Sequence, residues 1–338
     1  MILVNKKLLC GMPRSLAIIT GLFLLFVGLP FLGLSNFFLQ QAFTLFFFIA
    51  LAQSWNILGG YTGYLSLGHA AFLGIGGYAV AIPYYLLGWS PFLTFPIAGI
   101  AAGLFALLIG VICFRIKGSY FLIATMLVLF ILQTLAVNLR TITNGANGID
   151  MPLFTTNFMI EGRIWYYSGF AMVVLTLVAA FLIERSRFGL NLMAIREDED
   201  VARTMGVRVV HCKAYAFIIS AAFVGVLGAI YSYRAHSIEP STAFNLELSA
   251  APILMAILGG SRNWLGPIIG AIVYHVISTT LTLLVGNEYS ELLFAAFLVV
   301  VVLLLPEGLM GLIAKVSKSR HIATDKLMSL NINNESKK

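Results

Sequence analysis

The sequence ERSRFGLNLMAIREDEDVARTMGVRVVHCK, residues 184–213, is a charged segment within an apolar chain and is called the charged loop below. It holds 11 of the 35 formally charged residues of the chain, six basic and five acidic. Apolar segments of 20 residues without Lys, Arg, Asp or Glu lie on either side, at residues 164–183 and 214–233. Each would span about 30 Å as an α-helix, close to the thickness of the hydrocarbon core of a bilayer. We therefore expect the charged loop to lie in water between two membrane spans.

The composition of the whole chain indicates a membrane protein. Its 338 residues are 60% hydrophobic and only 10% charged, and the mean hydropathy is +0.95. Residues 15–114 contain no formal charge over 100 positions, and the first carboxylate of the chain is Asp150. A soluble core does not bury so long an uncharged run, whereas repeated membrane crossing explains it. Because these runs are apolar all round rather than alternating, we expect an all-α, polytopic transmembrane helical bundle and not a β-barrel.

The net charge of +7 could suggest nucleic-acid binding, but the basic residues lie at the ends of apolar runs. That arrangement is typical of the positive-inside rule, by which cytoplasmic loops are rich in Lys and Arg. We therefore expect no nucleic-acid partner, and we place the charged loop and both termini in the cytoplasm.

Ten apolar segments are predicted to cross the membrane. They are residues 15–34, 37–58, 59–87, 91–114, 118–139, 164–183, 214–233, 248–260, 267–285 and 289–306. Residues 248–260 would form only about 20 Å of helix, and joining them to residues 267–285 as one broken helix would give nine crossings. Nine crossings would place the basic tail outside, so ten are favoured. Residues 1–314 then form one transmembrane domain, and residues 315–338 form a basic cytoplasmic tail that is partly disordered.

Two glycine-interrupted apolar segments, residues 59–77 and 259–270, occur in the two halves of the chain. Paired broken segments are typical of transport proteins, where helix breaks line a path near the middle of the membrane. His69 could contact a substrate or gate the path, although a helix-end histidine bonded to backbone is the commoner role. Ser66 could line the path or bond between helices. The candidate path residues are Gly63, Ser66, Gly68, His69, Gly259 and Gly260.

The charged loop has a helical pattern of its own. Apolar residues recur in it at spacings of three, four and seven, at Leu190, Met193, Ala194, Val201 and Met205. This pattern predicts one or two short amphipathic helices with that stripe buried and the charges on the other faces. A simple connector between two spans is usually shorter. We therefore expect a docking element rather than a plain solvated loop.

The sequence offers no reaction chemistry of its own. It has no G-x-x-x-x-G-K-[ST] motif, so it lacks the usual phosphate cradle of an ATPase, and we find no catalytic or metal-binding cluster. We expect a transport protein rather than an enzyme, with no cofactor bound by this chain. An ion-coupled secondary carrier is an alternative, but such carriers usually keep acidic residues within the membrane, and here the acids cluster near the predicted ends of spans.

Four segments carry a resemblance to a known family. They are GYTGYLSLGHAAFLGIGGY, SRFGLNLMAIREDEDVARTMGV, ILGGSRNWLGPIIGA and PEGLMGL, which occur in this order over residues 55–312. They resemble the LivM-type membrane permeases of branched-chain amino-acid ABC importers. Permeases for urea or short amides look similar, so an importer of those substrates is an alternative. One departure is the turn Ser261–Asn263, where the family more often has a second glycine-rich turn.

The resemblance implies a multi-pass permease in the inner, or plasma, membrane of a bacterium. It implies three kinds of partner: a second, homologous permease, two cytoplasmic ATP-binding subunits that use ATP and Mg, and a periplasmic or extracellular amino-acid-binding protein. It also implies that the charged loop couples the permease to the ATP-binding subunits. The residues at the matching positions are Arg187, Phe188, Gly189, Arg196, Glu197, Asp198, Ala202 and Gly206.

Overall fold

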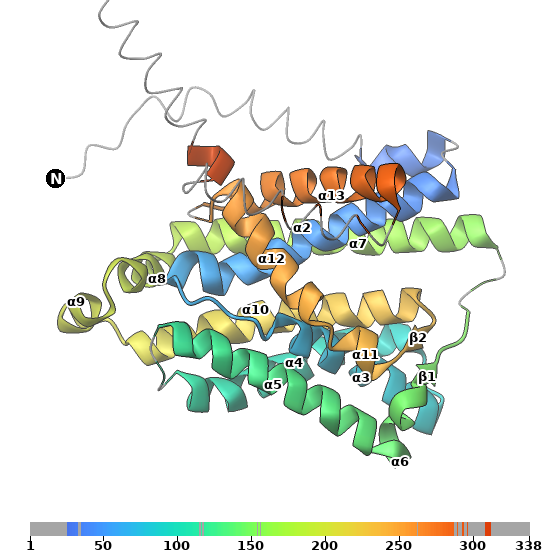
Figure 1. Ribbon diagram of the computed structural model, residues 1–338, viewed down its shortest axis with the longest axis horizontal. Helices are drawn as coiled ribbons and strands as arrows, with labels where there is room; N and C mark the ends of the chain where they lie inside the picture. Colours follow the sequence, from blue (N-terminus) through green and yellow to red (C-terminus); the bar gives the residue numbers. More distant parts are fainter. Residues whose placement is uncertain are drawn as a thin grey trace, which may run out of the picture.

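The structure is a computed structural model that describes residues 26–32 and 35–286, apart from 115, 117, 154, 156 and 262, together with 289, 293, 296 and 308–311. Within these residues, eight helical segments are long and apolar enough to cross a membrane. Seven are single helices: α2 (Asn36–Thr62), α3 (His69–Leu87), α4 (Pro91–Cys113), α5 (Ser119–Asn138), α7 (Phe158–Arg185), α10 (Val209–Arg234) and α13 (Gly266–Val285). The eighth contains α11 (Pro240–Ala243) and α12 (Leu246–Gly259). The predicted all-α, polytopic class is confirmed (Figure 1).

Short elements occupy the two ends of the bundle (Figure 1). The charged loop forms α8 (Arg187–Glu197) and α9 (Glu199–Thr204) at one end. The other end holds α6 (Arg140–Thr143), η3 (Gly145–Asn147) and the paired strands β1 (Ile149–Asp150) and β2 (Ser237–Ile238). A further turn, η2 (Leu29–Leu32), precedes α2. Most of predicted spans 15–34 and 289–306, and the whole tail from residue 315, lie outside the described residues, so ten crossings remain a prediction.

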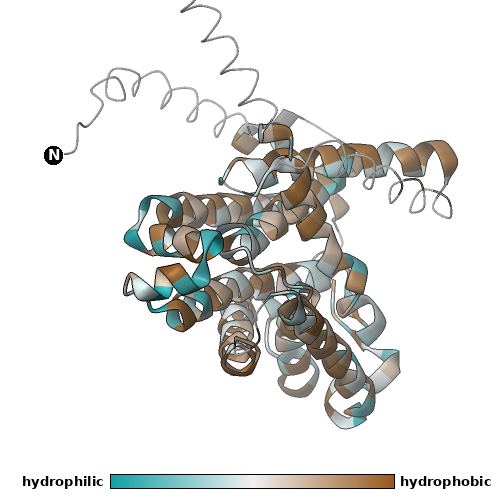
Figure 2. Ribbon diagram, turned by 60° about the vertical axis from the view of Figure 1, so that its left-hand side comes forward, coloured by the Kyte–Doolittle hydropathy of each residue, from teal (hydrophilic) through white to brown (hydrophobic). Residues whose placement is uncertain are grey.

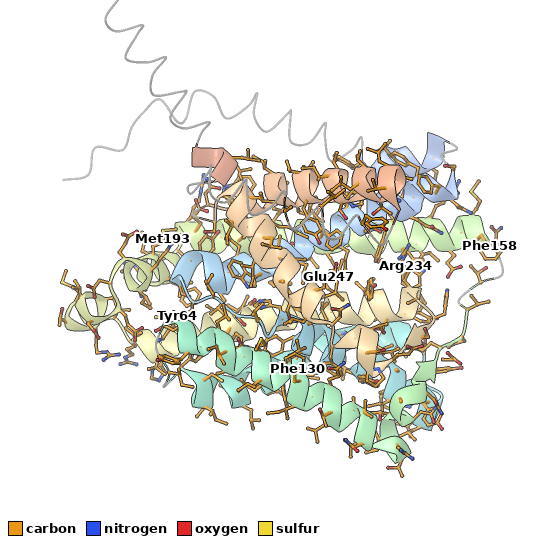
Figure 3. All side chains as sticks on the ribbon, viewed as in Figure 1. Tyr64, Phe130, Phe158, Met193, Arg234 and Glu247 are labelled. Carbon is orange, nitrogen blue, oxygen red and sulfur yellow. The ribbon has the colours of Figure 1, made fainter. Side chains whose placement is uncertain are left out.

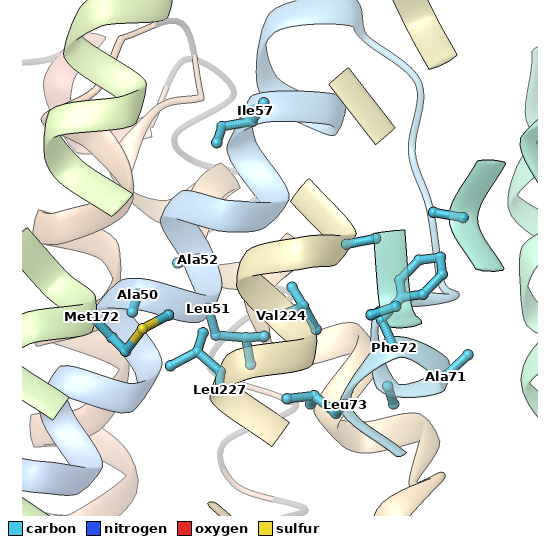
Figure 4. Packing of buried hydrophobic residues seen from close by; sticks show 14 of the residues in the cluster. Ala50, Leu51, Ala52, Ile57, Ala71, Phe72, Leu73, Met172, Val224 and Leu227 are labelled. Carbon is cyan, nitrogen blue, oxygen red and sulfur yellow. The ribbon is translucent and has the colours of Figure 1, made fainter. Parts of the chain in front are cut away.

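Helix α10 is the centre of the packing, since it contacts α2, α3 and α4. Glycines allow this closeness: a Cβ on Gly76 would lie 1.9 Å from the carbonyl oxygen of Gly225, and one on Gly228 would lie 2.1 Å from that of Leu73. Small residues of this kind let helix backbones approach in a membrane. The adjacent core is filled by apolar side chains of α2, α3 and α10, namely Leu51, Phe72, Leu73, Val224 and Leu227 (Figure 4).

The outer faces of the bundle carry large apolar side chains. Leu104, Ile112 and Leu283 are 62%, 65% and 77% exposed on α4 and α13. Hydrophilic residues gather instead on α8 and α9 and around the short elements at the opposite end (Figure 2). This is the surface expected of helices whose sides meet lipid or a neighbouring membrane helix and whose ends meet water.

The glycine-rich segment at residues 59–78 is a broken helix. Helix α2 ends at Thr62, and the next residue, Gly63, has a φ of 77°, in the left-handed region that favours glycine. Residues 63–68 are non-helical, and the indole Nε1 of Trp55 donates to the carbonyl oxygen of Ser66 at 3.0 Å. Helix α3 then begins at His69. The glycine-interrupted segment at residues 59–77 is therefore broken at residues 63–68.

The second glycine-rich segment is a hairpin. Helices α12 and α13 pack along each other, and the chain reverses between them. A Cβ on Gly270 would lie 1.8 Å from the carbonyl oxygen of Met255, and one on Gly259 would lie 1.7 Å from that of Gly266. The alternative in which residues 248–260 and 267–285 form one broken helix is therefore wrong. The glycines bring the two arms together where a larger residue would hold them apart.

Candidate functional site: the junction of the charged loop with two helix breaks

The charged loop is folded as two capped helices, which confirms the helical pattern of the sequence. The Ser186 hydroxyl accepts a hydrogen bond from the backbone N–H of Gly189 at 3.1 Å, which caps α8. The Asp198 carboxylate accepts from the N–H groups of Asp200 and Val201 at 2.9 Å each, which caps α9. Gly206 follows α9 with a φ of 86°. The loop therefore contains two helices whose first residues are capped by side chains of the loop itself, and a glycine follows the second helix.

The prediction of a buried stripe was wrong for most of its residues, although Met193 packs partly buried against the core. Leu190, Val201 and Met205 are 63%, 56% and 81% exposed. The side chains buried against the rest of the protein are instead those of Leu192, Ile195 and Ala202. The physical reason is that α8 turns the Leu192 and Ile195 face toward α2 and α7, so the neighbouring apolar positions point away. Three large apolar side chains at the water-facing end of the bundle are the kind of surface that a partner covers.

Arg196 ties the charged loop to both helix breaks. Its guanidinium Nη1 donates to the carbonyl oxygen of Gly60, at the end of α2. The same Nη1 lies 3.4 Å from the carbonyl oxygen of Ser261, and Nη2 lies 3.4 Å from the Ser261 hydroxyl. Gly63 leaves room for the stem of this side chain, since a Cβ there would lie 3.2 Å from the Arg196 Cγ. One side chain of the loop therefore holds two membrane segments that are distant in sequence.

The two breaks also bond directly to each other. The Gln53 side-chain amide donates to the carbonyl oxygen of Trp264 at 2.6 Å, and the Asn56 amide donates to that of Asn263 at 3.4 Å. The Glu184 carboxylate, at the start of the charged loop, accepts from the Trp264 N–H at 3.0 Å and from the Tyr61 hydroxyl at 3.3 Å. The sequence suggested that the glycine-interrupted segments are a pair, and the structure brings them into contact.

A second anchor of the charged loop is a buried ion pair that sequence reasoning missed. The Lys213 Nζ lies 3.2 Å from both carboxylate oxygens of Glu199, and its side chain has no exposed surface. It also donates to the Tyr64 hydroxyl at 3.0 Å and lies 4.1 Å from the Tyr64 ring centroid. Tyr64 in turn donates to Glu199. Burial and this hydrogen bond raise the pKa of Tyr64, so its hydroxyl stays a donor at neutral pH.

The predicted path residues divide into two groups. Gly63 and Gly260 line a cavity of about 630 Å³ at the junction, beside Arg196 and Leu65. Ser66, Gly68 and Gly259 are buried in helix contacts. His69 is also buried at the start of α3, where its Nε2 lies 2.9 Å from the Ser220 hydroxyl. That hydroxyl donates to the carbonyl oxygen of Ser54 at 2.6 Å, so Ser220 on α10 links His69 to α2. A role of His69 in the path stays a prediction.

The predicted coupling residues divide in a similar way. Arg187, Glu197, Asp198 and Gly206 are exposed, and Phe188 and Arg196 are half-buried. Gly189 and Ala202 are buried within this protein. A Cβ on Gly189 would lie 2.0 Å from the carbonyl oxygen of Ile183, so this glycine sets the close approach of α8 to the end of α7. The exposed members remain available to a partner, and the buried ones shape the loop.

These features define a class: a polytopic helical membrane protein whose folded, water-facing loop forms hydrogen bonds to two breaks in its membrane helices. A family model for the branched-chain amino acid transport system permease component matches residues 37–302. The chain belongs to this family of permeases, as the resemblance of the four sequence segments implied.

Individual relatives agree with this assignment. The chain is 30% identical over 289 residues to the high-affinity branched-chain amino acid transport system permease protein LivM of Escherichia coli K12, covering 78% of this chain and 67% of the relative. It is 26% identical over 188 residues to the LivH permease of the corresponding system in Salmonella typhimurium, covering 52% of this chain and 59% of the relative. It is also similar to the ribose import permease RbsC of Bacillus subtilis, at 26% identity over 157 residues, covering 44% and 48%. No solved structure matches the chain significantly.

Proposed function

We propose that this chain is a pore-forming permease subunit of an ATP-driven importer that carries branched-chain amino acids across a bacterial inner membrane. The observation that carries the proposal is the junction at Arg196, where a loop facing water holds both broken membrane segments. A movement imposed on the loop from outside the membrane would be passed to those segments. The sequence has no G-x-x-x-x-G-K-[ST] motif, and in this proposal an ATP-binding partner supplies the movement.

The partners are inferred from chemistry and from the relatives. Leu190, Val201 and Met205 are exposed apolar side chains on the same loop as the acidic residues of α9, which suits docking to a soluble ATP-binding subunit. LivM and LivH are both named as permeases of high-affinity branched-chain amino acid systems, which supports a second, homologous permease beside this chain. An external amino-acid-binding protein would deliver the substrate to the opposite end. In this scheme this chain binds no cofactor, and ATP and Mg are used by the ATP-binding subunits.

The docking surface is tested by purifying the tagged chain in mild detergent from the organism that makes it. We expect a second permease and the ATP-binding subunits to be recovered with the wild-type chain. The triple variant Leu190→Ser, Val201→Ser, Met205→Ser should lose the ATP-binding subunits and keep the second permease, since an exposed patch supports docking but not the membrane fold.

A matched control places three serines on the lipid-facing side, at Leu104, Ile112 and Leu283, which are equally exposed. This control should keep the ATP-binding subunits in any complex that is still recovered. Full retention of the ATP-binding subunits by the loop variant would contradict the assigned docking surface. Recovery of the wild-type chain alone would instead favour a secondary carrier.

A further inference from the structure

A second cavity, of about 350 Å³, lies at the end of the bundle opposite the charged loop. It is enclosed by the starts of α2 and α7 and the end of α10. Figure 3 shows Arg234 and Phe158, which line it, toward one end of the molecule, and Tyr64 and Met193 toward the other. Its volume lies within the range of about 300–1,000 Å³ that is usual for sites of small molecules. In the proposed orientation this end faces the external binding protein.

One side of the cavity gathers hydrogen-bond acceptors. The Glu161 carboxylate is fixed there by the indole N–H of Trp165 at 3.2 Å and by His236, whose Nε2 lies 2.7 Å away. The Glu161 side chain is only 10% exposed. A carboxylate accepts about four hydrogen bonds, so Glu161 has acceptor sites left for an ammonium group with three N–H donors.

The other side of the cavity presents a cation. The Arg234 guanidinium lies 4.5 Å from the centroid of the Phe43 ring, which orients it. It forms no ion pair or hydrogen bond with any other described residue, even with Glu161 in the same cavity. Five N–H donors in a planar fork match a carboxylate. Leu39, Phe43 and Trp165 add an apolar wall between the two charged groups.

We propose that this cavity binds a zwitterionic α-amino acid with an apolar side chain. Arg234 takes the carboxylate, Glu161 takes the ammonium group, and the apolar wall takes the side chain. The two protein charges share a cavity without pairing, so a ligand that carries both opposite charges suits it better than a simple anion or cation. The proposal rests on the function proposed above, for which it names an entry site on this chain.

The site is tested by equilibrium dialysis of tritiated L-leucine against the purified complex, without ATP and without the external binding protein. We expect saturable binding that L-leucinamide and 4-methylpentanoate do not displace at equal concentration, since each lacks one of the two charges. Arg234→Gln and Glu161→Gln should each weaken binding by about tenfold or more, because each removes a hydrogen bond to a charged group. Arg163→Gln is the matched control at the same end, since Arg163 does not line the cavity, and it should bind as wild type.

Protection of an introduced thiol locates the ligand independently. Leu153 lines the cavity and is 58% exposed, whereas Phe37 is 64% exposed and does not line it. L-Leucine should slow maleimide labelling of the Leu153→Cys variant and leave that of Phe37→Cys unchanged. Absence of saturable binding, or binding and protection that persist in Arg234→Gln, would overturn the site. ATP-driven uptake by the wild-type complex is measured in parallel. Normal uptake without leucine binding would contradict only the proposed site, whereas absent uptake would contradict the proposed importer function.

Discussion

Replacing Arg196 by alanine is expected to reduce substrate uptake by about tenfold or more while the chain stays in the membrane. The substitution removes the hydrogen bonds from the guanidinium to Gly60 and Ser261. A hydrogen bond to a charged group contributes about 1.5–3 kcal/mol, which corresponds to at least a tenfold change in an equilibrium. The loop would keep its caps at Ser186 and Asp198, so it should still dock. ATP hydrolysis by the complex should therefore continue while uptake falls.

The readout is the ratio of uptake to ATP hydrolysis in proteoliposomes. Arg185→Ala is the control, since Arg185 is also a basic residue of the charged loop but lies over the Phe181 ring, with 4.1 Å to its centroid. An exposed contact of this kind is worth about 0.5–1 kcal/mol, and the ratio should stay near wild type. An unchanged ratio in Arg196→Ala would show that Arg196 does not transmit movement between the loop and the helix breaks.

Replacing Lys213 by methionine is expected to destabilise the protein by about 3–5 kcal/mol, the usual result of removing one partner of a buried ion pair. Two cations lie 3.2 Å from the Glu199 carboxylate, whose side chain is 14% exposed, and the substitution removes the buried one and leaves the exposed Arg203. It also removes the donor at 3.0 Å to the Tyr64 hydroxyl. The contact between the charged loop and the break after α2 should loosen, which lowers the temperature of thermal unfolding in detergent.

Two further variants separate the buried charge from a general effect of mutation. Lys213→Met combined with Glu199→Gln should recover part of the lost stability, because the second change neutralises the carboxylate left behind. Arg203→Ala should have a small effect of about 0–1 kcal/mol, since the Arg203 side chain is 53% exposed and its ion pairs to Glu199 and Asp200 lie at the surface. Wild-type thermal stability in Lys213→Met would show that the pair does not anchor the loop.

The sequence predicted the class of fold because membrane spans depend on composition over about 20 residues, which one chain displays directly. It predicted the helices of the charged loop from periodicity, but not which face is buried. Leu190 and Leu192 are both apolar, and only the position of α2 and α7 decides that Leu192 turns inward. Periodicity identifies a stripe, whereas burial depends on a neighbour that is distant in sequence.

The contacts between the charged loop and the helix breaks could not be predicted either, because they join residues that are distant in sequence. Arg196 was selected through its place in the docking loop, and its bonds to Gly60 and Ser261 bridge 136 and 65 positions. Lys213 and Glu199 are 14 positions apart, with no helical register between them. The only available sign in the sequence was that Lys213 directly precedes the apolar run at residues 214–233. The two glycine-interrupted segments were predicted to be a pair, because paired helix breaks are typical of transport proteins, but the hydrogen bonds that join them were not predicted.

Uptake of tritiated L-leucine into proteoliposomes that contain the purified complex and its external binding protein tests the importer function most directly. ATP is enclosed on the side of the charged loop, and an ionophore is added to dissipate ion gradients. We predict uptake that requires ATP and persists with the ionophore. Uptake by this chain alone, without ATP and abolished by the ionophore, would contradict the account and identify a secondary carrier.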